Sequence, residues 1–360
     1  MSIAAHFAQS YAEARDKFLA AVDAAGLDAE SHIHPLRGRD DETLAMDVVL
    51  DGDPHARRLL LVSSACHGVE GFCGSGIQIA LLRDAAWRAA ARESGVAVLY
   101  LHALNPYGFS WWRRATQENV DLNRNFQDFS RPLPENPAYD EIAGLIVPPT
   151  WPPSQAVDQR LQQLIAERGM GALQAAVSGG QFTHAEGLYY GGRNPTWSNQ
   201  TLRHVLQEHA RRCDKLAWID LHTGLGPSGH GERIFAGRDD AAALQRARTW
   251  WGDSVTSIYD GSSSSSLITG MMWQAADEEC PQAQYTGIAL EFGTKPVLEV
   301  INALRAEQWL ENHPETPEAQ QVAIKRELRD AFYTDDDDWK ERVVAQAREA
   351  CQQALHGLRG

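Results

Sequence analysis

Two side chains that can bind a metal ion stand three residues apart in the stretch SSACHGVEG. His67 and Glu70 follow an apolar run, and Gly68 and Gly71 let the backbone turn sharply beside them. A neutral imidazole and a carboxylate are good zinc ligands. A histidine and a glutamate also occur at this spacing by chance, so the pair alone is a weak indication of a metal site.

Two more such side chains each follow an apolar run farther along the chain. His222 stands in IDLHTGLG and Glu291 in IALEFGT. A lone histidine is more often a core residue than a ligand, and that alternative applies to His222. A glutamate is rarely buried without a partner. Burial would raise the pKa of Glu291 and suit it to act as a general base.

A basic and polar cluster lies in residues 105–126, NPYGFSWWRRATQENVDLNRNF. It contains Arg113, Arg114, Asn123 and Arg124. Arginines in a cleft make planar, bidentate contacts with carboxylates, so the cluster indicates an anionic substrate group. Taken by itself, the cluster is better explained as a solvated charged loop.

The overall composition limits the classes of partner. The chain has 360 residues, with 48 Asp and Glu against 33 Lys and Arg, for a formal net charge of −15. This charge argues against general nucleic-acid binding and against anionic membrane surfaces. The five cysteines form no CxxC pair, the N-terminal stretch lacks a signal-peptide core, and no apolar run approaches the roughly 18 residues of a membrane helix. We expect a soluble, cytoplasmic protein of undetermined oligomeric state.

The periodicity of apolar residues predicts alternating strands and helices. Strands are expected at 43–50, 58–65, 96–103, 216–221 and 285–292, and helices at 5–25, 75–93, 155–177, 198–212, 239–250, 297–311, 318–332 and 339–357. The order strand, loop, helix, strand is typical of an α/β sheet. Ligands bind outside the carboxyl ends of strands in such sheets, which is where His67, His222 and Glu291 fall.

In order along the chain, these stretches resemble the zinc carboxypeptidase superfamily. The resemblance covers roughly residues 58–295 and rests on HxxE, Arg, Asn-Arg, His and Glu at His67, Glu70, Arg114, Asn123, Arg124, His222 and Glu291. DLNRNF and GLYYGGRNPTWSN (187–199) are similar to a bacterial branch near the aspartoacylase and succinylglutamate desuccinylase relatives. The resemblance implies a three-layer α/β/α fold with a mixed, mostly parallel twisted sheet. We expect a single domain, 1–360, with a catalytic core at about 40–300, an insertion at about 131–186 and a helical C-terminal segment at about 297–360.

The resemblance also implies a catalytic metal centre. His67, Glu70 and His222 would hold one zinc ion per chain and leave the fourth position to water. Glu291 would be the general base. Cys66 adjoins the first ligand, and we interpret it as a small buried residue.

Further roles follow from the resemblance for the basic cluster. Arg114 would stabilise the oxyanion, although its neighbour Arg113 is an alternative. Asn123 and Arg124 would bind the substrate carboxylate. Asp121 would accept a hydrogen bond from the histidine of the HxxE element.

Two assignments outside these motifs remain open. Tyr259 is the candidate for the tyrosine that classical members carry on a loop, but a packing role explains it equally well. Asp277, Glu278 and Glu279 would make the side-chain pocket acidic if they lined it, whereas a solvated turn is the simpler interpretation.

Together these residues predict a zinc-dependent hydrolase that cleaves an amide bond next to a free carboxylate. Its substrate would be a small peptide, as for a carboxypeptidase, or an N-acyl amino acid, as for an aspartoacylase-like deacylase. An insertion 131–186 that roofs the cleft would exclude long peptides. A non-catalytic zinc-containing binding protein is the alternative from another class.

Overall fold

The middle layer of the fold is a mixed β-sheet. A computed structural model describes residues 2–360, so Met1, the first residue of the predicted single domain 1–360, lies outside the described residues. The described part contains seven strands in the order β1-β2-β4-β3-β5-β7-β6. They are β1 (Glu30–Arg37), β2 (Thr43–Asp51), β3 (Arg58–Ser64), β4 (Ala97–His102), β5 (Lys215–Ser228), β6 (Gly231–Phe235) and β7 (Gln284–Gly293).

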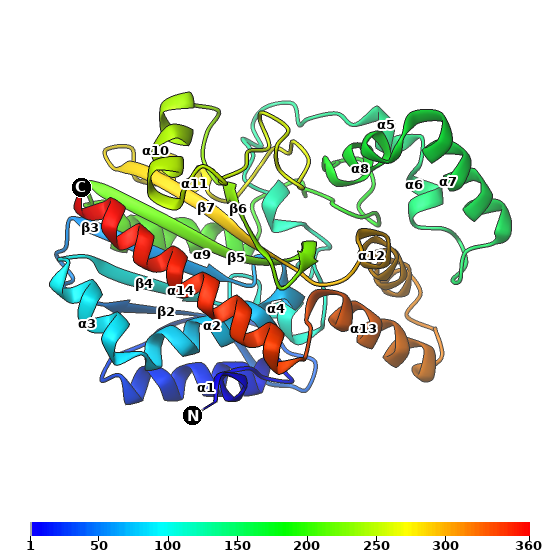
Figure 1. Cartoon of the computed structure of the whole chain (residues 1–360). Helices are drawn as coiled ribbons and strands as arrows, with labels where there is room; N and C mark the ends of the chain where they lie inside the picture. The colour runs from blue at the N-terminus through cyan, green and yellow to red at the C-terminus, as the bar shows by residue number, and fades with distance from the viewer. Residues whose placement is uncertain (1) are drawn as a thin grey trace.

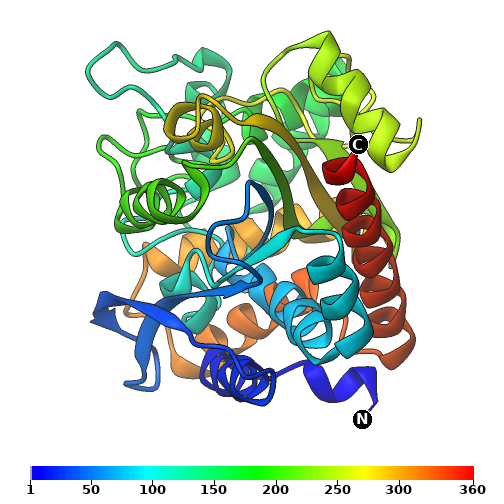
Figure 2. The same ribbon diagram turned by 90° about the vertical axis from the view of Figure 1, so that its left-hand side faces the viewer.

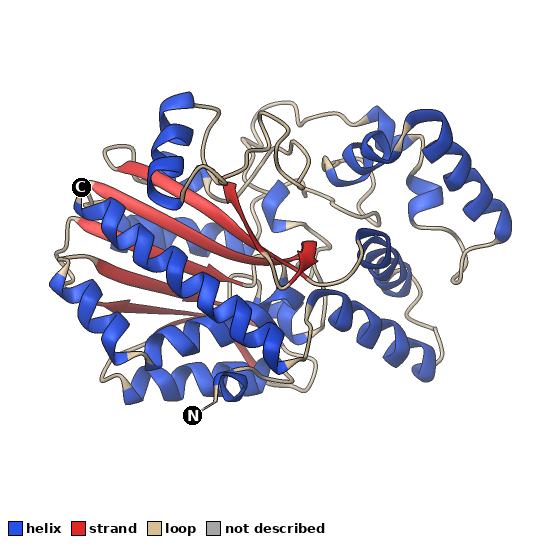
Figure 3. Cartoon of the chain, viewed as in Figure 1, coloured by secondary structure: helices blue, strands red, loops and turns tan. Residues whose placement is uncertain are grey.

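Helices cover both faces of this sheet (Figure 3). They are α1 (Tyr11–Ala24), α2 (Gly71–Arg83), α3 (Ala85–Glu93), α4 (Pro106–Ser110), α5 (Pro137–Asp140), α6 (Ala143–Ile146), α7 (Gln155–Arg168), α8 (Met170–Ser178), α9 (Trp197–Val205), α10 (Ala241–Trp251), α11 (Gln274–Glu279), α12 (Val297–Glu311), α13 (Glu318–Phe332) and α14 (Asp337–Arg359). Among residues 2–360, every helix is too short or too polar to cross a membrane.

The four central strands, β4, β3, β5 and β7, run parallel, and β1, β2 and β6 join by antiparallel pairing. Alternate side chains of β3 enter two separate cores. Leu60 and Val62 pack with α1, α2 and α14 on one face, and Leu59 and Leu61 pack with α9 on the other. A strand buried on both faces must be apolar at nearly every position, as β3 is. The predicted three-layer α/β/α class with a mixed, mostly parallel sheet is therefore confirmed.

Several predicted elements differ in detail from the observed ones. The helix predicted at 155–177 is divided into α7 and α8 at Gly169, which has a φ of 84°. The helix predicted at 75–93 is divided at Asp84, whose side chain caps α3 by accepting from the Ala86 and Trp87 amides. Strands β1 and β6 and helix α11 were not predicted. Strand β1 is largely exposed, so it lacks an apolar signal, and Figure 2 shows this blue end of the sheet projecting at the left.

The segments around the predicted insertion lie beyond one end of the sheet. Helices α5 to α8 lie above that end in Figure 1, and α12 and α13 lie below it. Strands β5 and β7 run toward the gap between these two groups. Two helical groups therefore flank the carboxyl ends of the central strands, where α/β sheets bind ligands.

A buried histidine makes the stability of this fold depend on pH. His102 ends β4, is fully buried and lies 2.8 Å from Ser75 Oγ through Nε2. Burial lowers its pKa from 6.5 to about 4, with Asp47 on β2 opposing the shift and Arg15 adding to it. As the pH falls below 6.5, the unfolded chain therefore takes up this proton before the folded chain does.

We expect this histidine to cost the fold about 3 kcal/mol between pH 6.5 and pH 4, with the full stability present above pH 6.5. A His102→Gln variant should lose less stability than the parent over this range, measured as the free energy of unfolding by urea. His55→Gln, which changes an exposed histidine, is the matched control. Identical pH dependence in the His102→Gln variant and the parent would contradict the assignment.

Candidate metal centre and active site

The first part of the site is the turn that follows β3. His67 precedes a one-turn helix at Gly68–Glu70, of which Glu70 is the last residue, directly before α2. The amides of Gly68 and Val69 donate to the carbonyls of Arg114 and Arg113, at 3.2 and 2.8 Å. A Cβ on Gly68 would lie 2.0 Å from the carbonyl carbon of Gly108, so only glycine allows this close approach.

The second part comes from two neighbouring strands. His222 on β5 lies opposite Glu291 on β7 in parallel register. Both residues are buried, and both line the same cavity as His67 and Glu70. The strand register therefore brings two residues that are 69 positions apart in sequence to one edge of the sheet.

The side chains of these two parts converge on one carboxylate. His67 Nδ1 lies 2.8 Å from Glu70 Oε1, and His222 Nδ1 lies 3.0 Å from Glu70 Oε2. One potential ligand atom from each of the three residues lies within 4.8 Å of the others. The amide of Thr223 also donates to Glu70 Oε2, at 3.1 Å, and helps to orient the carboxylate.

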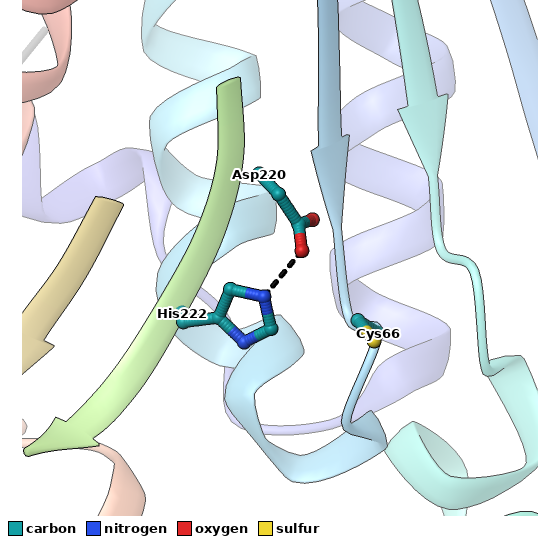
Figure 4. A group of neighbouring side chains, drawn as sticks. All are labelled: Cys66, Asp220 and His222. Atoms are coloured by element: carbon teal, nitrogen blue, oxygen red, sulfur yellow. Dashed lines mark hydrogen bonds and ion pairs between the residues drawn. The ribbon is translucent and has the colours of Figure 1, made fainter. Parts of the chain in front are cut away.

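The other nitrogen of each imidazole faces an aspartate. His67 Nε2 lies 3.3 Å from Asp121 Oδ1, and Arg114 Nη2 lies 2.8 Å from the same nitrogen. His222 Nε2 pairs with Asp220 Oδ2 (Figure 4). Asp220 in turn accepts a 2.5 Å hydrogen bond from Ser63 Oγ on β3. In each ring, Nε2 therefore faces an aspartate carboxylate that can orient the ring, while Nδ1 faces Glu70.

This arrangement fits a zinc ion. Two imidazole nitrogens and one carboxylate are a common ligand set for catalytic zinc, and ligand histidines usually donate their second N–H to a carboxylate. Cys66, Asp220 and His222 form a second group of possible ligands, drawn in Figure 4. Within the described residues, however, the cavity is lined by His67, Glu70 and His222 and not by Cys66 or Asp220. The first group is therefore the one that is open to the cavity.

The charges of the site stabilise its buried carboxylates. Burial alone would raise the pKa of Glu70, but the imidazoles of His67 and His222 outweigh burial and lower it. Burial opposes ionisation of Asp121 as well, yet Arg114 and Arg124 hold its pKa well below the ordinary value. Both groups are thus anionic at neutral pH, as a cation site requires.

Glu291 has the opposite electrostatic environment. Burial, followed by the negative charge of Glu70, raises its pKa to about 8. Its Oε1 accepts a 3.0 Å hydrogen bond from the amide of Leu225, which fixes one carboxylate oxygen. A divalent cation beside it would lower this pKa toward neutrality, because it favours the ionised form.

The two adjacent arginines point to different places. Arg114 lines the cavity, where Nε donates to Asp121 Oδ2 at 3.0 Å and Nη1 to Glu70 Oε1 at 3.3 Å. Arg113 instead donates from Nε to Glu307 Oε1 on α12, at 2.9 Å, and is 4% exposed. Arg114 is therefore the arginine beside the candidate metal site, and Arg113 anchors the loop to α12.

The predicted carboxylate-binding pair also lines the cavity. Asn123 Oδ1 accepts a 3.0 Å hydrogen bond from the amide of Met272. Arg124 donates to the carbonyls of Asn123 and Ser178, and its buried Nε has no hydrogen-bond partner. Both side chains therefore border the space beside the candidate metal site.

The remaining predicted residues lie elsewhere. Tyr259 donates its hydroxyl to the carbonyl of Gly237, and among the described residues it is not part of the cavity lining. The acidic residues 277–279 all belong to α11 rather than to a turn. Asp277 pairs with Arg238, and Glu278 and Glu279 pair with Arg203.

Residues 7–346 match a protein family described as "Protein of unknown function (DUF2817)". The chain belongs to this family. No curated protein matches the sequence.

Solved structures that resemble this DUF2817 chain include those of several metal-dependent hydrolases. Carboxypeptidase A from Helicoverpa armigera is 13% identical, with 90% of this chain and 74% of that chain covered and a TM-score of 0.44. The metallo-carboxypeptidase from Burkholderia cenocepacia is 11% identical, with 88% and 67% covered and a TM-score of 0.38. The succinylglutamate desuccinylase/aspartoacylase from Rhodobacter sphaeroides is 13% identical, with 80% and 65% covered and a TM-score of 0.36. These likenesses concern the fold alone.

Two residues of the DUF2817 site were not recognised in the sequence. Asp220 stands two positions before His222 on a strand, and this spacing puts both side chains on one face, which is a usable signal. Tyr189 lines the cavity, and its ring lies 5.0 Å from the Arg114 guanidinium and 5.4 Å from that of Arg124. Tyr189 belongs to GLYYGG, a stretch whose sequence alone gives no indication of its position.

The contact between Asp220 and His222 leads to a test of the metal site. We expect Asp220→Asn to weaken zinc binding about 10- to 100-fold, because the amide orients the ring less strongly than the carboxylate. Competition for zinc against a chromophoric chelator measures this affinity. Asp214→Asn, which changes an exposed aspartate paired with Arg57, should leave it unchanged. Equal zinc affinity in the two variants would show that Asp220 does not contribute to zinc binding.

Proposed function

We propose that this protein is a zinc-dependent hydrolase that cleaves an amide bond next to a free carboxylate. The observation that carries the proposal is the convergence of His67 Nδ1 and His222 Nδ1 on the Glu70 carboxylate, at 2.8 and 3.0 Å, in a cavity shared with Glu291. A zinc ion in such a site activates water and polarises a carbonyl group.

Glu291 and Arg114 would carry out the proton transfer and the charge stabilisation. The Glu291 carboxylate would take a proton from the attacking water and deliver it to the nitrogen of the leaving amine. The Arg114 guanidinium would donate to the carbonyl oxygen as negative charge develops there. The support for these roles is that both side chains line the cavity beside Glu70.

Asn123 and Arg124 would bind the substrate carboxylate. The support for this role is that both side chains line the cavity and that a guanidinium binds carboxylates well. Asp121 and Asp220 would hold the two imidazoles. We assign Arg113 to the ion pair with Glu307 rather than to substrate, and we assign Tyr259 no direct contact with substrate.

The choice between a carboxypeptidase and a deacylase depends on the insertion. Leu161 of α7 and Leu173 of α8 line the same cavity as His67. Helices that close over a cleft leave little room for a long peptide, so we favour a small N-acyl amino acid over a polypeptide. The carboxypeptidase reaction on short peptides uses the same groups and remains the second candidate.

The test is a zinc measurement combined with a substrate panel. We expect about one zinc ion per chain, and hydrolysis of N-acyl amino acids or dipeptides but not of long peptides. One zinc ion without hydrolysis of any amide would support the non-catalytic alternative. Protein that binds no zinc would refute the proposal.

A further inference from the structure

The cavity beside the candidate metal site is much larger than the metal site itself. Its volume is about 320 Å³, within the range of roughly 300–1000 Å³ for pockets that bind small molecules. Three helices outside the motif residues form much of its wall: α7, α8 and α12. This extra wall must receive some part of the substrate.

Each of these helices points an apolar face toward the cavity. Leu161 and Ile165 on α7, and Leu173 and Val177 on α8, lie four residues apart and thus on one side of each helix. On α12, Leu298 and Ile301 line the same space.

The wall retains exposed apolar surface in the absence of a ligand. Leu298 is 51% exposed and the neighbouring Val297 is 37% exposed. Exposed apolar side chains that gather around a pocket mark a binding site for an apolar group. The charged Arg305 of this wall is occupied, because it donates to the carbonyls of Ile146 and Leu145.

The lining residues of α7, α8 and α12 also include polar ones, among them Asp158, Gln174 and Asn302, but the apolar residues of these helices outnumber them. Asn123, held by the Met272 amide, lines this cavity together with Trp273 and Ala289. If the substrate carboxylate binds at Asn123 and Arg124, it lies beside the end of α8, because Arg124 donates to the carbonyl of Ser178. The apolar residues of α12, which follows β7 and Glu291, and those of α7 and the earlier part of α8 are then available to the part of the substrate on the other side of the amide bond.

We infer that the acyl part of the substrate is aliphatic and binds between α7–α8 and α12. This inference rests on the proposed function. In the reaction, water adds to the acyl carbon, the C–N bond breaks and the nitrogen gains a proton. The products are an aliphatic carboxylic acid and a free amino acid. The acyl unit comes either from a hydrocarbon chain or from an apolar amino-acid residue of a dipeptide.

A series of acyl-chain lengths tests the inference. Zinc-loaded full-length protein is given acetyl, butanoyl, hexanoyl and octanoyl derivatives of glycine, leucine, glutamate and lysine. We expect kcat/KM to rise about threefold per methylene, or roughly 80-fold from acetyl to hexanoyl, because each methylene leaves water. Leu-Xaa and Ser-Xaa dipeptides form a second arm, in which faster cleavage of the leucine member is expected. The faster of the two arms identifies the source of the acyl unit.

Variants of the wall connect this preference to the named helices. Leu173→Ser and Leu298→Ser should each reduce the hexanoyl-to-acetyl ratio of kcat/KM at least fivefold, whereas Leu173→Met should restore most of it. Leu36→Ser changes a leucine of β1 that is 45% exposed and outside the cavity lining, and it should keep the parental ratio. Thermal melting and zinc content show whether each variant folds. The half-exposed Leu298 is the safer site if Leu173→Ser does not fold.

These experiments distinguish a failure of this inference from a failure of the proposed function. Hydrolysis with a flat or falling dependence on chain length would overturn this inference and leave the proposed function standing. If no amide is cleaved, the proposed function fails. Titration with acetate, hexanoate and octanoate then decides the binding question. Tighter binding of the longer acids supports an aliphatic site, and equal affinity overturns it.

Discussion

A Glu291→Gln variant should keep its zinc ion but hydrolyse substrate about 10²- to 10⁴-fold more slowly than the parent protein. The side chain keeps its size and can still accept from the Leu225 amide. It loses the ability to take up a proton, and general base catalysis of this kind contributes about 10²- to 10⁴-fold. The measurements are kcat on the best substrate of the panel and zinc content by elemental analysis.

A matched control separates this effect from a general change of charge. Glu341→Gln alters an exposed glutamate of α14 and should leave kcat unchanged. If Glu291→Gln kept the parental kcat, Glu291 would have no part in proton transfer. If it lost zinc as well, its role would be in metal binding rather than in catalysis.

An Arg113→Met variant should lose about 3 kcal/mol of its free energy of unfolding. Arg113 and Glu307 form a 2.9 Å ion pair in which both side chains are at most 4% exposed. Removing one partner leaves a buried charge less well compensated, which costs about 3–5 kcal/mol, and we take the lower value because Lys325 also pairs with Glu307. Urea unfolding followed by tryptophan fluorescence measures the loss.

Two comparison variants test whether this loss of stability comes from the buried ion pair. Arg131→Met breaks an exposed pair with Asp128 and should cost less than about 1 kcal/mol. The double variant Arg113→Met/Glu307→Met removes both buried charges and should be more stable than Arg113→Met alone. Equal losses in Arg113→Met and Arg131→Met would show that the buried pair contributes no more than a surface pair.

The same ion pair connects stability to the site. The Arg113 and Arg114 carbonyls accept from the amides of Val69 and Gly68, between His67 and Glu70. Loosening of Arg113 should therefore displace the turn that holds two of the proposed zinc ligands. We expect zinc affinity to fall together with stability in the Arg113→Met variant.

Local patterns were sufficient for most of the fold. Helix α13 begins and ends where the apolar spacing predicted, and β3 and β7 lie within one residue of the predicted bounds. These elements pack one face or both faces into a core, so burial leaves a periodic pattern in the sequence. Strand β1 has little buried surface, so its sequence shows no such periodic pattern.

The sequence by itself determined which residue types stand at the ends of the central strands, because a strand buried on both faces must be apolar and must end where polar side chains begin. His67, His222 and Glu291 could be located in that way. Only the tertiary structure decided that Arg114 rather than Arg113 faces the cavity, and that α7, α8 and α12 line the same cavity. These features depend on strand register and on the packing of segments more than a hundred residues apart, and no local spacing in the chain records such contacts.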